Sequence, residues 1–180
     1  MTRRRFIGEE HLKVDAKGRM SIPAPFRRVL DAGDPDRESG SMPSMVIVQE
    51  DTRKDCLQCY TVEAMQEIQE MVEEMPLGSD EQKVMEQIYF MGATELTIDD
   101  TGRIVLSAKL RDKIGVTPNS ELVLAGAGKN FRIWRPEAYQ AEQVDTVKEW
   151  LDAQPKDFDP RSLLQEMQKQ RRQRDAGGEA

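Results

Sequence analysis

The sequence predicts a β-rich α+β fold built from two copies of one unit. Residues 12–27 align without gaps on residues 96–111, and their apolar positions coincide together with one Asp, one Gly and two Arg. In both segments an alternating strand pattern meets a tight-turn signal and then a second short strand. At 180 residues the chain can form one large domain or two small ones.

The first elements of each copy are two strands around an Asp-x-x-Gly turn. The turn suits a type I geometry followed by a glycine with positive φ, a conformation that glycine adopts without steric cost. The apolar residues of the leading strands are Leu12, Val14, Leu96 and Ile98, and the second strands cover residues 20–22 and 104–106. We therefore expect a β-hairpin in each copy.

The remaining elements follow in the same order in both copies. A short helix comes next, and in the second copy Ser107 can cap its beginning and Gly115 can end it. The first copy then carries a longer loop, 31–44, which is rich in Asp, Ser, Gly and Pro and which we expect to be mobile. Two strands and a longer helix complete each copy, with strands expected over 45–49, 57–60, 121–125 and 131–134 and helices over 62–75 and 136–153.

The long helices and a linking helix over 80–91 are amphipathic. We expect their apolar faces to pack in the core or against a neighbouring subunit, rather than to form a promiscuous binding surface. The faces comprise Met65, Ile68, Val72 and Met75; Val84, Ile88 and Met91, predicted to point inward; and Ala141, Val144, Val147 and Leu151.

These elements divide the chain into four parts. They are a first repeat over 1–78, a linking helix over 79–92, a second repeat over 93–153 and a charged C-terminal tail over 154–180. The tail holds a predicted helix over 161–173 and a basic cluster, 168–174, which we expect to be solvated; contact with phosphates is the alternative.

Charge is distributed unevenly along the chain. The formal net charge is -7, yet residues 1–30 carry eight Lys or Arg against three acids, and residues 61–91 carry eight acids against one Lys. Phosphate groups respond to the local field within about 8–10 Å. A basic N-terminal unit can therefore bind DNA while helices elsewhere hold the acidity.

Several classes of protein are disfavoured. The N-terminus lacks the apolar stretch of a signal peptide, and no run of residues is apolar enough to span a bilayer, so we expect a cytoplasmic protein without membrane contact. Cys56 and Cys59 lie far in sequence from the only histidine, His11, and we expect buried thiols rather than a metal site. His11 has no evident nucleophile partner, so we predict no enzyme, no catalytic residue and no cofactor.

Glycine-rich residues 126–130 do not complete a phosphate-binding loop. Val123 occupies the position of its first glycine, and Asn130 that of its Ser or Thr. We expect a hairpin turn there.

The repeated turns are the strongest functional signal. Arg19 and Arg103 directly follow the turn glycines, and a two-stranded ribbon can enter the major groove, where Arg binds guanine O6 and N7. We expect Asp15 and Asp99 to cap the turns and to hold these guanidinium groups by charge-assisted hydrogen bonds. A lone surface ion pair is the alternative, but the turn requires only the glycine, and the arginine recurs in both copies.

These residues resemble the MraZ family. The resemblance rests on the duplicated D-x-x-G-R turns, on Ile22-Pro23-Ala24 and on Ile133-Trp134 before Pro136-Glu137, and it covers residues 6–153. It implies tandem AbrB-like swapped-hairpin units that form a double-split β-barrel with peripheral helices. It also implies a ring-shaped homo-oligomer, an octamer or larger, which displays the turns on one face.

The resemblance further implies a function and its residues. It suggests a nucleoid-associated transcriptional repressor that binds G-rich repeats in double-stranded promoter DNA of the division and cell wall gene cluster, its own gene included. The DNA-binding residues would be Asp15, Lys17, Gly18, Arg19, Asp99, Gly102 and Arg103, with Arg19 as principal base contact, Arg103 as the second and Lys17 on phosphate. Arg3, Arg4 and Arg5 would add non-specific attraction.

The second copy departs from the family pattern. Thr101 replaces Lys17 and Ser107 replaces Pro23, which weakens the case for its contribution to affinity. Two other functions remain open: an AbrB-like antitoxin or transition-state regulator, and a ring-forming scaffold that binds proteins through acidic helices.

Overall fold

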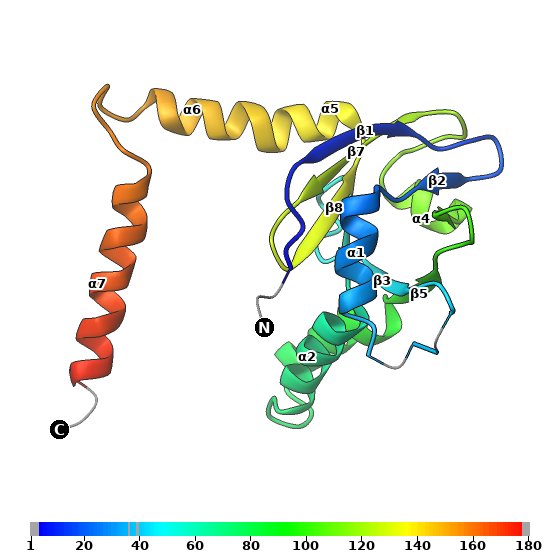
Figure 1. The fold of residues 1–180 in the computed structure, drawn as a ribbon. Coiled ribbons are helices and arrows are strands. Elements are labelled where there is room, and N and C mark those ends of the chain that lie inside the picture. The colour runs from blue at the N-terminus through cyan, green and yellow to red at the C-terminus, as the bar shows by residue number, and fades with distance from the viewer. Residues whose placement is uncertain (1–3, 36, 39, 178–180) are drawn as a thin grey trace. The chain divides into compact units, whose positions relative to one another are not determined.

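The computed structural model describes residues 4–35, 37–38 and 40–177. The chain divides into two units, residues 1–140 and residues 141–180. The first unit holds a mixed α/β fold with an antiparallel sheet and several helices (Figure 1). No helix in the described part of the chain is long and apolar enough to cross a membrane.

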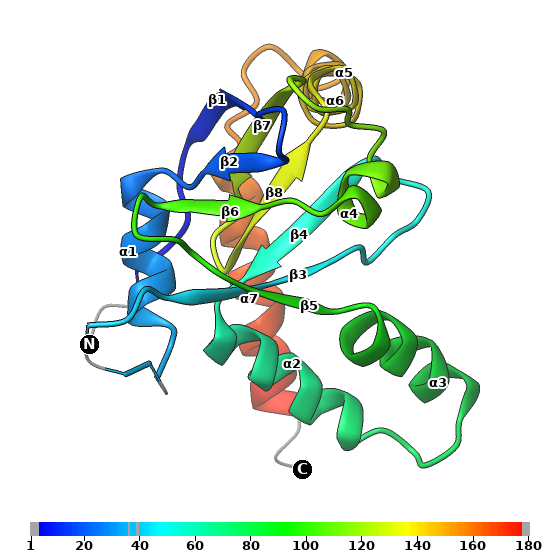
Figure 2. The same cartoon turned by 90° about the vertical axis from the view of Figure 1, so that its right-hand side faces the viewer.

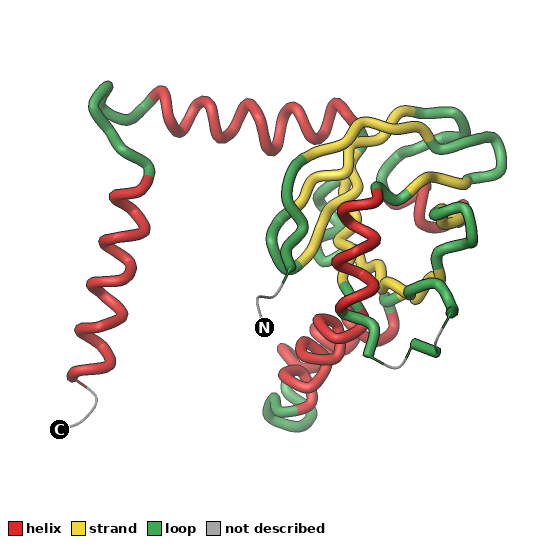
Figure 3. The backbone as a smooth tube through the Cα atoms, in the orientation of Figure 1, coloured by secondary structure: helices red, strands yellow, loops and turns green. Residues whose placement is uncertain are grey.

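Within the described residues, eight strands and the helices between them follow the predicted order. The strands are β1 (Glu9–Lys13), β2 (Arg19–Ser21), β3 (Ser44–Val48), β4 (Cys56–Tyr60), β5 (Thr94–Thr97), β6 (Arg103–Val105), β7 (Glu121–Gly126) and β8 (Asn130–Trp134). The helices of the first unit are α1 (Ala24–Ala32), α2 (Val62–Glu73), α3 (Asp80–Glu86), the π-helical turn η1 (Gln87–Met91), α4 (Ala108–Lys113) and α5 (Pro136–Tyr139). Figure 3 shows these elements by type.

Strand pairing joins the two copies of the repeat. Six strands form an antiparallel sheet in the order β1-β7-β8-β4-β3-β5, and β2 pairs with β6 in a separate ribbon. In the sheet, β1 pairs with β7, β5 with β3 and β4 with β8. Every strand of one copy therefore pairs with at least one strand of the other copy. The sheet has β1 and β5 as its edges, so it is not a closed barrel.

The expected hairpins form only at their turns. Asp15 N donates to Arg19 O (2.9 Å), and Asp99 N donates to Arg103 O (2.7 Å). Beyond these bonds the prediction was wrong, because β1 pairs with β7 and β2 with β6 instead of with each other. The alternation of apolar side chains does not determine the partner of a strand. A strand turns the same apolar face to the core whichever neighbour it pairs with.

The core lies between the sheet and the β2–β6 ribbon, which lies in front of the sheet in Figure 2. Met20 and Ile104, at the centre of the ribbon, are both buried in it. Three aromatic rings from separate segments, Phe6, Phe26 and Phe131, meet there with centroids 5.0–5.4 Å apart. Such contacts join side chains of both copies in one core.

Helix ends agree with the sequence signals. Ser107 Oγ accepts from Leu110 N (3.3 Å) at the start of α4, and Gly115 has φ +63° just after its end. Thr61 caps α2 in the same way, with Ala64 N as donor (3.1 Å). Hydroxyl caps satisfy backbone N–H groups that have no partner inside the helix.

The expected inward face of the linking helix is wrong. Val84 is 53% exposed and Met91 65% exposed, while Ile88 is half-buried. Residues 87–91 form a π-helical turn, which contains one residue more than an α-turn and rotates Met91 away from the expected face. Val84 precedes this turn, and nothing in the structure explains its exposure. Tyr89 packs against the apolar cluster under α2 in their place.

The second unit is helical. It contains most of the π-helical segment η2 (Gln140–Asp145), followed by α6 (Thr146–Asp152) and α7 (Arg161–Gly177). The rings of Trp150 and Phe158 make an edge contact with centroids 5.6 Å apart. Side chains of residues 161–174 are exposed, as expected for a solvated tail.

Residues 31–44 contain the end of α1, a loop and the start of β3, and positions 36 and 39 lie outside the described residues. Asp34 Oδ2 accepts from Ser44 N (2.8 Å), which ties the loop to the beginning of β3. The expected turn over residues 126–130 is confirmed: it joins β7 to β8, with Gly128 at φ +78°.

Candidate nucleic-acid interface

The two Asp-x-x-Gly-Arg turns have the same geometry. Gly18 N donates to Asp15 O (3.0 Å), Gly102 N donates to Asp99 O (2.8 Å), and both glycines have φ +79°. The predicted type I turn with a left-handed glycine is therefore present in both copies.

In the first turn the aspartate binds both the backbone and the arginine. Asp15 Oδ1 accepts from the backbone N of Lys17 (2.8 Å) and of Arg19 (2.9 Å). Its Oδ2 accepts from Arg19 Nε (2.7 Å) and lies 2.7 Å from Arg19 Nη2. One carboxylate oxygen, Oδ2, therefore holds both Nε and Nη2 of Arg19 and sets the direction of its guanidinium, as expected from the sequence.

The second turn repeats this arrangement with one change. Asp99 Oδ1 accepts from Thr101 N (2.9 Å) and Arg103 N (2.9 Å), and Oδ2 accepts from Arg103 Nε (3.2 Å). Thr101 Oγ1 also donates to Asp99 Oδ1 (2.6 Å). Thr101 occupies the position of Lys17 in the first copy. The second turn therefore lacks that positive charge and gains a hydrogen bond to its aspartate.

Hydrogen bonds to the two carboxylates favour their charged forms. The backbone N–H of Arg19 is the main cause of the lowered pKa of Asp15. The Thr101 hydroxyl, followed by the Arg103 N–H, lowers the pKa of Asp99 to about 2. Both aspartates are therefore charged partners for arginine at neutral pH.

The arginines of the two turns share one face of the ribbon. Along β2 and β6, side chains alternate between the core and solvent, so Met20 and Ile104 point inward and both arginines point outward. Arg19 lies opposite Val105, and Arg103 lies opposite Ser21. The exposed fraction of the side chain is 35% for Arg19 and 33% for Arg103. The predicted site residues of both copies are thus brought together at one surface.

Two further arginines support the turns from behind. Arg27 Nη1 donates to Ile22 O (2.7 Å), and a Cβ placed on Gly102 would lie 2.3 Å from that same nitrogen. Arg111 Nη1 donates to Leu106 O (2.5 Å) and stands equally close to the Cβ position of Gly18. Each guanidinium therefore packs against the turn glycine of the other copy.

Sequence reasoning gave these two residues no role, although they are the second arginine pair of the aligned repeat. Neither of them makes an ion pair with a described carboxylate. They add positive charge directly behind both turns.

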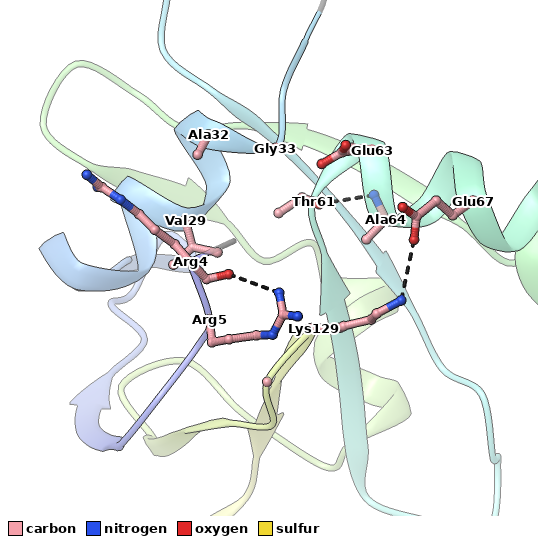
Figure 4. Close-up of a pocket in the computed structure, with 11 residues that line it drawn as sticks. Arg4, Arg5, Val29, Ala32, Gly33, Thr61, Glu63, Ala64, Glu67 and Lys129 are labelled. Atoms are coloured by element: carbon pink, nitrogen blue, oxygen red, sulfur yellow. Dashed lines mark hydrogen bonds and ion pairs between the residues drawn. The ribbon is translucent and has the colours of Figure 1, made fainter. Parts of the chain in front are cut away.

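The exposed lysine of the first turn, Lys17, adds one more cation at the ribbon end. Arg4 and Arg5 line a different feature, an open cavity of about 360 Å³ beside α1 and the start of α2. Arg3 lies outside the described residues. Figure 4 shows Lys129 Nζ on the cavity wall paired with Glu67 Oε2 (3.5 Å), so basic and acidic groups face the same space. This mixed charge makes the cavity a poorer phosphate site than the ribbon.

No cluster of three His, Cys, Asp or Glu side chains suited to a metal occurs among the described residues. Cys56 and Cys59 are buried in β4, and burial raises the pKa of the Cys59 thiol. A neutral thiol inside the core is a poor metal ligand and a poor nucleophile.

Comparison with known proteins gives the ribbon its context. A family model described as "MraZ protein, putative antitoxin-like" matches residues 89–157. A protein of Ruegeria pomeroyi named "Transcriptional regulator MraZ" is 47% identical over 161 residues, which are 89% of this chain and 95% of the relative. The chain belongs to the MraZ family.

Further relatives with the same name span most of the chain. The protein of Ruegeria sp. (strain TM1040) is 45% identical over the same length and coverage, and that of Cereibacter sphaeroides (strain ATCC 17029) is 39% identical over 166 residues, 89% of this chain and 96% of the relative. These names describe the relatives as transcriptional regulators.

Proposed function

We propose that this MraZ-family chain is a sequence-specific DNA-binding transcriptional regulator whose β2–β6 ribbon contacts base edges. One observation carries the proposal: the guanidinium groups of Arg19 and Arg103 lie on the same outward face of the ribbon, each oriented by an aspartate of its own turn. A fixed fork is what bidentate recognition of guanine requires. The names of the relatives support the same function.

The residues have distinct proposed roles. Arg19 is the principal base contact and Arg103 the second, while Lys17 binds backbone phosphate. Asp15 and Asp99 set the direction of the arginines, and Gly18 and Gly102 permit the turns. In this proposal Arg27 and Arg111 raise the local positive potential from behind.

The wider context follows the family resemblance. We propose AbrB-like swapped-hairpin units with the repeat boundaries 1–78 and 93–153, and a homo-oligomeric ring of eight or more subunits acting on the nucleoid. In a ring, neighbouring ribbons bind spaced G-rich repeats at high effective concentration, which compensates for the weak binding of one ribbon. The proposed outcome is repression of the division and cell wall gene cluster that includes the protein's own gene.

Fluorescence anisotropy with duplex DNA from upstream of the gene tests the proposal. Arg19→Ala should weaken specific binding by about 1–3 kcal/mol, or roughly 5- to 150-fold at 25 °C. Lys17→Ala should weaken binding to all sequences and flatten the dependence of log K on log salt by about one unit.

Arg53→Ala is the matched control. Arg53 pairs with Asp51 in an exposed turn (Nε to Oδ1 2.8 Å) but lies outside the ribbon. Arg53→Ala removes one positive charge, as Arg19→Ala does, and should leave the affinity for specific DNA nearly unchanged. Equal binding by wild type and Arg19→Ala would refute the proposed function.

A further inference from the structure

The outward face of the ribbon carries one apolar residue among polar ones. Besides the two arginines, Ser21 and Val105 point outward, because they alternate with the buried Met20 and Ile104. Val105 is 54% exposed. A single exposed valine needs no explanation on an ordinary surface. This one, however, stands at the proposed base-contacting position.

The strand register gives the two arginines different neighbours. Arg19 lies directly opposite Val105, whereas Arg103 lies directly opposite Ser21. Directly opposed residues in an antiparallel pair have Cβ atoms about 4.5–5.5 Å apart on the same face. The valine methyl groups therefore lie beside the Arg19 side chain, and the serine hydroxyl lies beside Arg103.

The two neighbours recognise different base edges. A valine offers only apolar contact, and in the major groove the apolar group of the bases is the C5-methyl of thymine. A serine hydroxyl can donate or accept a hydrogen bond and so suits any base edge. The two halves of one ribbon are thus chemically unequal although their turns are alike.

We propose that Val105 is a specificity-determining residue that contacts the C5-methyl group of a thymine beside the guanine bound by Arg19. This inference rests on the proposed function of the ribbon. The half of the site contacted by Arg103 and Ser21 has no such methyl preference. One subunit therefore recognises an asymmetric sequence, with thymine required on one side only.

Replacing thymine with deoxyuridine tests the contact, because this change removes the methyl group and keeps every hydrogen-bonding group of the base. Duplexes selected by the wild-type chain from a randomised library would be resynthesised with deoxyuridine at one thymine position at a time. Wild type should lose about fourfold in affinity at one thymine position per bound subunit, the effect of losing one methyl-sized apolar contact.

Substitutions in the ribbon should change the ratio of affinities for the thymine and deoxyuridine duplexes in defined ways. Val105→Ser should bind the thymine and deoxyuridine duplexes equally, and Val105→Thr, which keeps one methyl group, should give an intermediate ratio. Ser21→Val should create a second sensitive position on the other half of the site. Val147→Ser is the control, since Val147 is similarly exposed (56%) on α6 and should keep the wild-type ratio. Thermal melts check that each variant is folded.

The outcomes separate this inference from the proposed function. If wild type binds both duplexes equally at every thymine while Arg19→Ala still loses binding, the role of Val105 is wrong and the regulator function stands. If Val105→Ser loses affinity relative to wild type by the same factor on both duplexes, so that the ratio between the duplexes persists, Val105 has a structural role and the inference is overturned. Wild-type affinity in Arg19→Ala would remove the function itself.

Discussion

At the scale of single residues, the aspartates of the turns have two opposing effects on DNA binding. Each one orients an arginine, and each one also places a negative charge where the proposed phosphate backbone would approach. The aspartates therefore weaken the electrostatic attraction between the ribbon and DNA, and they fix the direction of the arginine side chains.

These opposing effects predict the outcome of Asp15→Asn. The asparagine oxygen can still accept the turn N–H groups, but the charge that fixes the Arg19 fork is lost. Affinity for a scrambled duplex should rise, and the ratio of specific to non-specific affinity should fall. Anisotropy titrations on both duplexes measure the ratio. Asp51→Asn, in the turn that holds Arg53, is the control, and an unchanged ratio in Asp15→Asn would contradict the prediction.

The carboxyl of Asp99 predicts a dependence of stability on acid. Its pKa is lowered from the usual 3.8 to about 2 in the folded protein, first by the Thr101 hydroxyl. Unfolding therefore takes up a proton in acid, so stability from this group is complete above about pH 4 and is lost as the pH falls towards 2. Melting temperatures of Asp99→Asn should depend less on pH in this window than those of wild type.

Thr101→Val isolates the hydroxyl. NMR titration of Asp99 in this variant should show a pKa closer to 3.8, because the main hydrogen bond that lowers it is gone. A pKa that stays near 2 would mean that the backbone N–H groups and the Arg103 side chain account for the shift.

At the scale of elements, the turn glycines differ in what surrounds them. A Cβ on Gly18 would lie 2.8 Å from the backbone oxygen of Leu106, besides its contact with Arg111. The three atoms nearest to a Cβ on Gly102 all belong to the Arg27 side chain, and a Cβ on Gly128 would meet open space. All three glycines have φ close to +79°.

Alanine at each of these glycines should therefore destabilise the protein to a graded extent. Gly128→Ala should cost about 1–2 kcal/mol, the backbone penalty alone. Gly102→Ala should cost more, since Arg27 must move, and Gly18→Ala most, since a backbone carbonyl must move. Urea unfolding at neutral pH gives the order. A smaller loss for Gly18→Ala than for Gly128→Ala would show that the close approach has no energetic weight.

Most elements could be predicted because their signals are local. Alternation of apolar residues indicated the strands, Ser107 and Gly115 indicated the ends of α4, and the Asp-x-x-Gly spacing indicated the turns. Strand partners could not be predicted, since both alternatives bury the same residues and long-range packing decides between them. The exposed Met91 was missed because the π-helical turn over residues 87–91 interrupts the helical periodicity.

The candidate site was only partly visible in the sequence. The sequence singled out both turn arginines and both aspartates as candidates, because the motif occurs twice in a fixed frame. The contact of Arg27 with Gly102 could not be predicted, because the two residues lie far apart in the sequence and meet only in the folded chain. The two further arginines of the aligned repeat were the available signal.

At the scale of the whole molecule, the copies depend on one another. β1 finds its partner in β7, β5 in β3, and the ribbon takes one strand from each copy. Neither repeat can bury its apolar strand faces alone, so the first unit should unfold in one cooperative step.

Separate fragments test this dependence. Residues 1–92 and 93–180, each expressed alone, should lack stable tertiary structure by near-UV circular dichroism and amide exchange. An equimolar mixture should regain the signal of the intact chain, because the missing ladder partners are restored. A protected core in either fragment alone would refute the mutual dependence of the copies.

The joint origin of the β2–β6 ribbon also bears on protein synthesis. A ribosome that has released only the first repeat has produced Arg19 without the strand that lies opposite it. Messages cut short before the codon for Arg103 would yield peptides without an assembled ribbon, so incomplete products should not compete with the finished protein for its binding sites. Translation beyond Val105, the last residue of β6, is thus needed before a new molecule can form the ribbon.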